Sequence, residues 1–164
     1  MGLTHPTARR SLSGTTPLAT TAIMGYTLKI GEATIDYSTE YVEIDCDTVR
    51  HDDSPAFGEP TDFTNERWPS YSGWADFSDA LGIRDIMYGH DGFQFKGDDF
   101  YPLIRQHPGV APITAAHLAI VKEKTETYKS KHPGSDYNLK RAEWLIYWME
   151  WALANCKMPV FVNS

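Results

Sequence analysis

The chain has only two cysteines among its 164 residues, and it lacks the motifs of the common cofactors. Cys46 and Cys156 are too few for a zinc site made of cysteines alone. We expect two free thiols in a reducing compartment, with a single disulfide as the alternative. No Walker sequence and no GxGxxG fingerprint is present, so we expect no cofactor.

Basic residues are also scarce. The chain carries 15 lysines and arginines against 22 acidic residues, a net charge of −7. A protein that binds the phosphate backbone needs a basic surface, so we expect no direct nucleic-acid binding. A protein partner, if there is one, would itself be basic.

An uninterrupted apolar run of membrane-spanning length is missing. The most apolar long stretch, residues 137–156, carries Lys140, Arg141, Glu143 and Glu150. Charges at depth in a bilayer are costly, so we expect no membrane span.

Aromatic residues, in contrast, are abundant, at 13% of the chain. Trp144, Trp148 and Trp151 recur at i, i+4 and i+7, which is one face of an α-helix. The rest of residues 137–156 is apolar on most sides, as is typical of a buried helix. We therefore interpret this helix as the scaffold of the fold and expect function elsewhere.

Residues 1–24 differ in composition from residues 25–164. They contain Arg9 and Arg10, many small polar residues and no acid. We interpret them as a flexible arm or N-terminal extension ahead of a single domain at 25–164. Three explanations stay open: an extension before an internal start at Met24, an arm that docks on a neighbouring subunit and so makes a homo-oligomer, or a targeting peptide.

The pattern of the domain predicts an α+β fold, in which a small antiparallel β-meander packs against a helical layer with the Trp-rich C-terminal helix at its centre. The expected elements are three short strands between 26 and 46, with turns at 31–32 and 38–40; a long loop at 50–72; helices at 72–81, 83–88, 112–131 and 137–156; and a last strand at 158–162 that joins the N-terminal sheet. His117, on the apolar face of the third helix, is expected to be a core histidine.

Charge is most uneven between Glu32 and Asp62, where ten acidic residues face one base, Arg50. Aromatic residues interleave with these acids, among them Tyr37 and Tyr41. Acids mixed with aromatics suit a basic protein partner. We therefore predict a non-enzymatic protein-binding or assembly protein that acts through residues 32–63. The expected contact residues are Asp52, Asp53, Phe57, Glu59, Asp62 and Phe63. Phe57 and Phe63 are equally suited to holding the long loop against the core.

The alternative is a metal-dependent hydrolase. Two loops each carry a His-Asp pair, and imidazole with carboxylate suits divalent metals. Its candidate catalytic residues are His51, Asp53, His90 and Asp91, with further acids at Asp52, Asp98 and Asp99. The spacing matches no ligand pattern, so we predict no metal site. Glu143 and Glu150 are seven residues apart on one helix, which favours a solvated stripe over a catalytic carboxylate pair.

In its small size, acidity and aromatic richness the chain is similar in general character to small phage-encoded accessory or structural proteins. That resemblance rests on no particular motif. We expect a cytoplasmic location, or a virion-associated one if the protein is phage-encoded.

Overall fold

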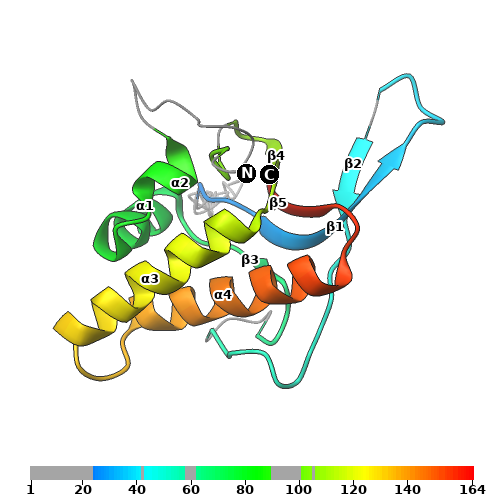
Figure 1. The fold of residues 1–164 in the computed structure, drawn as a ribbon. Coiled ribbons are helices and arrows are strands. Elements are labelled where there is room, and N and C mark those ends of the chain that lie inside the picture. Colours follow the sequence, from blue (N-terminus) through cyan, green and yellow to red (C-terminus); the bar gives the residue numbers. More distant parts are fainter. Residues whose placement is uncertain (1–23, 42, 58–61, 90–100, 105) are drawn as a thin grey trace, which may run out of the picture.

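The computed structural model describes residues 24–41, 43–57, 62–89, 101–104 and 106–164. A curled antiparallel sheet packs against helices, which confirms the predicted α+β class (Figure 1). The elements in chain order are β1 (Leu28–Asp36), β2 (Glu43–Cys46), β3 (Glu66–Arg67), α1 (Tyr71–Leu81), α2 (Arg84–Tyr88), β4 (Gly109–Pro112), α3 (Ala115–Lys131), α4 (Tyr137–Asn155) and β5 (Pro159–Asn163). The predicted arm, apart from Met24, lies outside the described residues.

The C-terminal strand closes the N-terminal sheet, as predicted. The strand order is β2-β1-β5-β4, and every pairing is antiparallel. The short strand β3 pairs with the start of β1, at Leu28 and Lys29. β1 is therefore the central strand, because it contacts β2, β3 and β5 at once.

The predicted turn at Gly31-Glu32 is wrong, since β1 runs through both residues. Gly31 opposes Val160 of β5 and is covered by the side chain of Cys46. A Cβ atom at Gly31 would lie only 2.7 Å from Cys46 Sγ. Here glycine permits close packing instead of a reversal of the chain, and two of the three expected strands merge into one.

The third predicted helix begins later than expected. Pro112 belongs to β4, which the sequence did not predict, and α3 starts at Ala115. The Thr114 side chain caps this helix by accepting the N–H of His117. Proline is tolerated in β4 because β4 is an edge strand, where a missing N–H breaks no ladder.

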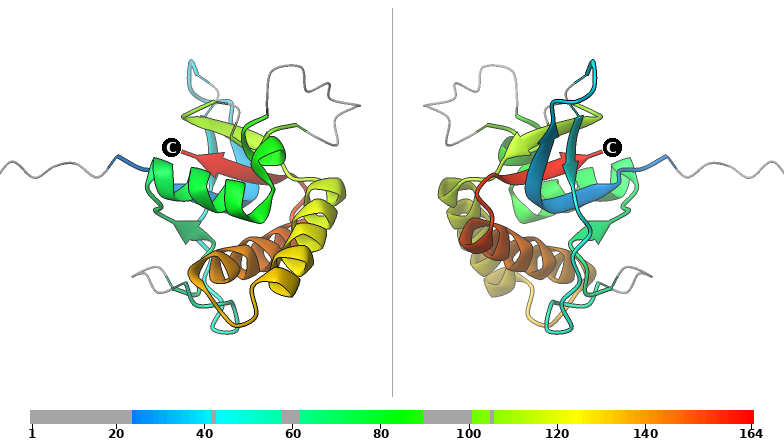
Figure 2. Two further views of the ribbon diagram at one scale, coloured as in Figure 1. Left: turned by 90° about the vertical axis from the view of Figure 1, so that its left-hand side faces the viewer. Right: turned by 90° about the vertical axis from the view of Figure 1, so that its right-hand side faces the viewer.

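Helix α4 forms the core, as predicted. Trp144 and Trp148 are fully buried, and Trp144 Nε1 donates to the carbonyl oxygen of Thr64 at 2.8 Å. Helix α3 runs antiparallel beside α4 (Figure 1). Helix α4 packs against β1 and β5, α3 packs on α4, and α1 contacts both helices (Figure 2).

Asn65 anchors the long loop to the sheet. Its buried side chain donates from Nδ2 to the carbonyl oxygens of Ile30 (2.7 Å) and Asp47 (2.8 Å). Its Oδ1 accepts the N–H of Val49 at 2.6 Å. Phe57, at 2% exposure, is buried in the core and adds an apolar anchor to the same loop.

Candidate functional site

Strands β1 and β2 form a hairpin that projects from the rest of the molecule (Figures 1 and 2). The described residues at its tip do not fold back onto the core. Tyr37 is 78% exposed and Tyr41 is 76% exposed. Ile44, on β2, is 41% exposed. All three side chains are therefore exposed among the described residues.

Every charged residue in the projecting part of the hairpin, residues 32–47, is acidic. Residues 32–47 contain no base, and their acids are Glu32, Asp36, Glu40, Glu43, Asp45 and Asp47. Hydrogen bonds from Ser38 hold the pKa of the Asp36 carboxyl below its ordinary value, and the Ser38 N–H lies 2.8 Å from Asp36 Oδ1. Asp36 therefore keeps its negative charge at neutral pH. We call residues 36–45 the hairpin surface; the structure describes all of them but residue 42.

The base of the hairpin is fixed by burial. Cys46 is 1% exposed and packs with Ala33 and Val160. Burial raises the pKa of its thiol to about 12, so Cys46 stays protonated and unreactive. Both cysteines are free thiols, as expected. The hairpin thus joins a rigid base to an exposed tip.

The outer edge of β2 is partly blocked. Strand β2 ends the sheet, and such an edge is open to pairing with a foreign strand. Here the Asp45 carboxylate accepts the N–H of Cys46 at 2.7 Å. That donor is therefore occupied, and charged neighbours further oppose strand addition.

The predicted contact residues of the loop lie in different surroundings. Asp52 is exposed and pairs with Arg50 at 3.4 Å. Phe57 is a core residue, Asp62 accepts the N–H of Phe57 at 3.0 Å, and Phe63 is half-buried. Glu59 lies outside the described residues. The exposed mixture of acids and aromatics is therefore on the hairpin, and the loop contributes mainly its exposed acids.

Two residues of the hydrolase hypothesis meet through a third that the sequence did not single out. The Tyr147 hydroxyl, on α4, donates to Asp53 Oδ1 at 2.8 Å and lies 3.0 Å from His51 Nδ1. Since that hydroxyl has one proton, His51 Nδ1 carries a proton and donates it to Tyr147. The His51 ring also packs on Trp148 and Trp151, at 5.1 and 5.5 Å. Burial and the Asp53 hydrogen bond raise the pKa of Tyr147.

This arrangement leaves His51 Nε2 without a partner in the described part of the chain. One oriented imidazole can accept a proton but does not hold a metal by itself. His90, Asp91, Asp98 and Asp99 lie outside the described residues, and within the described ranges no group of three potential ligands converges. The hydrolase alternative therefore stays a prediction.

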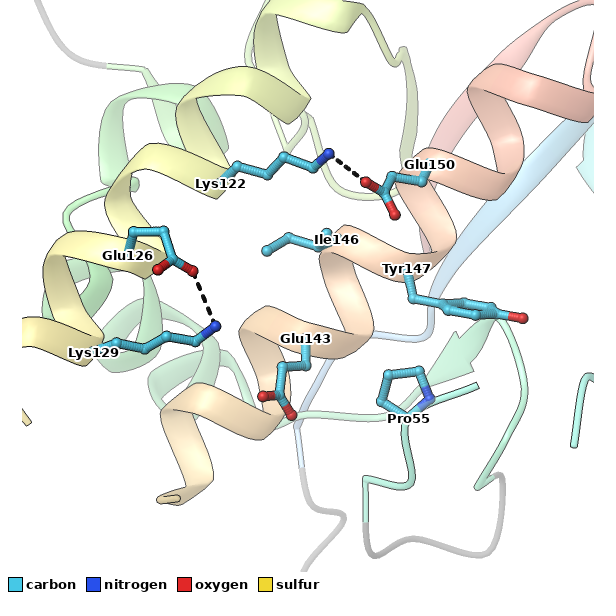
Figure 3. A pocket seen from close by; sticks show the side chains of 8 residues that line it. All are labelled: Pro55, Lys122, Glu126, Lys129, Glu143, Ile146, Tyr147 and Glu150. Atoms are coloured by element: carbon cyan, nitrogen blue, oxygen red, sulfur yellow. Dashed lines mark hydrogen bonds and ion pairs between the residues drawn. The ribbon is translucent and has the colours of Figure 1, made fainter. Parts of the chain in front are cut away.

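A groove of about 450 Å³ lies beside Tyr147, between α3 and α4 (Figure 3). It is lined by Pro55, Lys122, Glu126, Lys129, Glu143, Ile146, Tyr147 and Glu150. An ion pair joins Lys122 to Glu150, and Lys129 pairs with Glu126 at 3.0 Å. The first pair joins α3 to α4, and the second lies within α3. Because these charges compensate each other, the groove favours no particular class of ligand.

His117 is a buried core histidine, as predicted. Its Nδ1 contacts the Thr114 hydroxyl at 2.9 Å, and its Nε2 lies 2.7 Å from the carbonyl oxygen of Tyr101. Its ring nitrogens are thus used in fixing the start of α3.

Among the described residues, no helix combines the length and the apolar character needed to cross a bilayer. On the hairpin surface, exposed aromatic side chains occur together with acids that have no base among residues 32–47. Comparison with known proteins adds no relative, since no family model, curated protein or solved structure matches the chain.

Proposed function

We propose that the chain is a protein-binding or assembly protein whose hairpin surface contacts a basic partner. The observation that carries this proposal is the exposure of Tyr37, Tyr41 and Ile44 on the projecting hairpin, within residues 32–47, which contain no base. Aromatic side chains at an interface supply large contact area with little loss of conformational freedom. The surrounding carboxylates select a basic partner and speed its association.

The folded base of the hairpin supports the same proposal. Ala33 of β1 and Cys46 of β2 are paired and buried at the base of the hairpin. This buried base fixes the direction in which the tip projects. A preorganised surface loses less entropy on binding. Asp52 and Asp53 add acidic charge from the neighbouring loop, where both are exposed.

The test compares the tagged wild type with three tagged variants in its native host. One variant carries Tyr37→Ser and Tyr41→Ser, and a second carries Glu40→Lys and Glu43→Lys. The matched control is Asp76→Lys with Glu123→Lys, which reverses two exposed charges on α1 and α3. Co-purified proteins are quantified by mass spectrometry, and the affinity of each candidate partner is then measured with purified components.

We expect one basic partner to be retained by the wild type and the control and to be lost from both hairpin variants. Removal of an aromatic hot spot lowers affinity by about 30-fold or more. Binding should also weaken between about 0.1 M and about 1 M salt, because the screening length falls from about 10 Å to about 3 Å. Equal recovery of every partner by the hairpin variants would overturn the proposal.

A further inference from the structure

Three side chains that are distant in the sequence form a hydrogen-bonded relay at the start of α1. Tyr71 Oη lies 2.8 Å from His107 Nε2, and His107 Nδ1 lies 2.9 Å from Asn163 Oδ1. Asn163 is 1% exposed, and its Nδ2 donates to the carbonyl oxygen of Gly109 at 3.3 Å. None of these residues belongs to the hairpin surface.

The amide of Asn163 sets the direction of every proton in the relay. Because its Nδ2 donates to Gly109, its Oδ1 is the acceptor that faces His107. His107 Nδ1 therefore carries the proton, and the neutral ring has its lone pair on Nε2. The Tyr71 hydroxyl donates to that lone pair. A hydroxyl, a base that receives its proton and a third group that orients the base are the parts of a nucleophilic triad.

The relay is rigid and open to solvent. The Tyr26 ring packs edge-on against both Tyr71 and His107, with centroids 4.6 and 5.0 Å away. His107 is exposed and Tyr71 is half-buried, so a small molecule can reach both. Tyr71 is also the first residue of α1, where the peptide dipoles favour negative charge.

We propose that Tyr71 is a nucleophile for acyl transfer, with His107 as its general base and Asn163 as the residue that positions His107. Tyr26 and Asn163, whose side chains contact the Tyr71–His107 pair, are uncharged. A small, uncharged, activated ester suits these two neighbours, and it is the substrate class that we propose.

In the first step Tyr71 Oη forms a bond to the acyl carbon and the bond to the leaving oxygen breaks. The Tyr71 proton passes to His107 Nε2 and then to the leaving group, which departs as an alcohol or phenol. In the second step His107 takes a proton from water, the water oxygen bonds to the acyl carbon, and Tyr71 leaves with the proton. The net reaction converts an ester and water into an acid and an alcohol.

The experiment uses 4-nitrophenyl acetate as the probe and the full chain as the enzyme. Released 4-nitrophenolate is followed by absorbance, and acetylated tyrosines are mapped by mass spectrometry. Tyr37 and Tyr41 are exposed but have no histidine partner within the described residues, so they serve as references inside the same molecule. We expect acetyl groups to appear on Tyr71 far faster than on Tyr37 or Tyr41.

Variants then separate catalysis from structure. Tyr71→Phe should abolish the rapid initial release of 4-nitrophenolate that accompanies acetylation of Tyr71. His107→Gln should slow acetylation of Tyr71 by about 100-fold or more, the usual contribution of a general base. Asn163→Ala should slow it, and Asn163→Asp, which keeps an acceptor oxygen, should restore part of the rate. Acetylation of Tyr71 no faster than the reference tyrosines, in the wild type, overturns the proposal even if a variant fails to fold. An unchanged rate in a folded His107→Gln variant overturns it too and leaves the relay a structural link between α1 and β5.

Discussion

Aromatic residues are concentrated in both α4 and the β1–β2 hairpin, but their surroundings differ. Trp144 and Trp148 of α4 are fully buried and pack beneath the sheet. Tyr37 and Tyr41 of the hairpin are more than three-quarters exposed. The comparison shows that aromatic content alone does not identify a binding surface, because burial assigns one set to stability and leaves the other available to a partner.

The two regions also differ in how they treat charge. On the α3–α4 side, Lys122 pairs with Glu150 and Lys129 with Glu126. On the hairpin, six acids have no base among their sequence neighbours at 32–47. Compensated charges hold elements of one fold together, whereas uncompensated charge of one sign attracts an oppositely charged partner.

The largest effect is expected on the buried side. Trp144→Ala should lower the free energy of unfolding by about 3–5 kcal/mol, since it removes a large core side chain and leaves a cavity. The hydrogen bond from Trp144 Nε1 to Thr64 is lost as well. Urea denaturation followed by circular dichroism measures the change. A loss below about 1 kcal/mol would show that α4 is not the scaffold.

Asn65→Ala should have the next largest effect. It removes three hydrogen bonds and leaves the Ile30 and Asp47 carbonyl oxygens and the Val49 N–H without their partner. Unsatisfied buried groups cost about 1–3 kcal/mol each, so we expect a loss of about 3 kcal/mol in unfolding free energy. Asn155→Ala, at an exposed site on α4, is the matched control and should change little.

Tyr147→Phe should have a smaller effect that depends on pH. The folded pKa of Tyr147 is raised, so the folded protein holds this proton more tightly than the unfolded chain does. The associated stability is present below the ordinary tyrosine value of about 10 and is lost as pH rises through the folded pKa. Wild-type urea midpoints should therefore fall more steeply above pH 10 than those of Tyr147→Phe. Parallel pH profiles would contradict this assignment.

The smallest effect on stability is expected at the hairpin tip. Tyr37→Ser with Tyr41→Ser should change the free energy of unfolding by about 0.5 kcal/mol or less, because exposed side chains contribute little to the fold. The same pair of substitutions should have the largest effect on partner binding. If it instead destabilised the protein as strongly as Trp144→Ala, the contrast between the two regions would fail.

Local patterns predicted the helices better than the strands. The helical spacing of three tryptophans predicted α4. The predicted end of α1 at Gly82 is also found, where this glycine has a left-handed backbone conformation. Local reasoning failed at Gly31 and Pro112, where turn and helix-start chemistry were expected and strands were found. In both places a strand that is distant in sequence decides the structure. Cys46 of β2 packs against Gly31, and Val160 of β5 pairs with Pro112.

The sequence by itself determined the helix periodicity, the burial of the Trp-rich face and the acidic bias of residues 32–62. Each of these depends on neighbours within a few positions or on composition. Only the tertiary structure decided that Phe57 is buried while Tyr37 and Tyr41 are exposed, and that Tyr71 meets His107 and Asn163. The physical reason is distance along the chain. Tyr71 and His107 are 36 positions apart and His107 and Asn163 are 56 positions apart, so only the packing of the strands and helices brings them together.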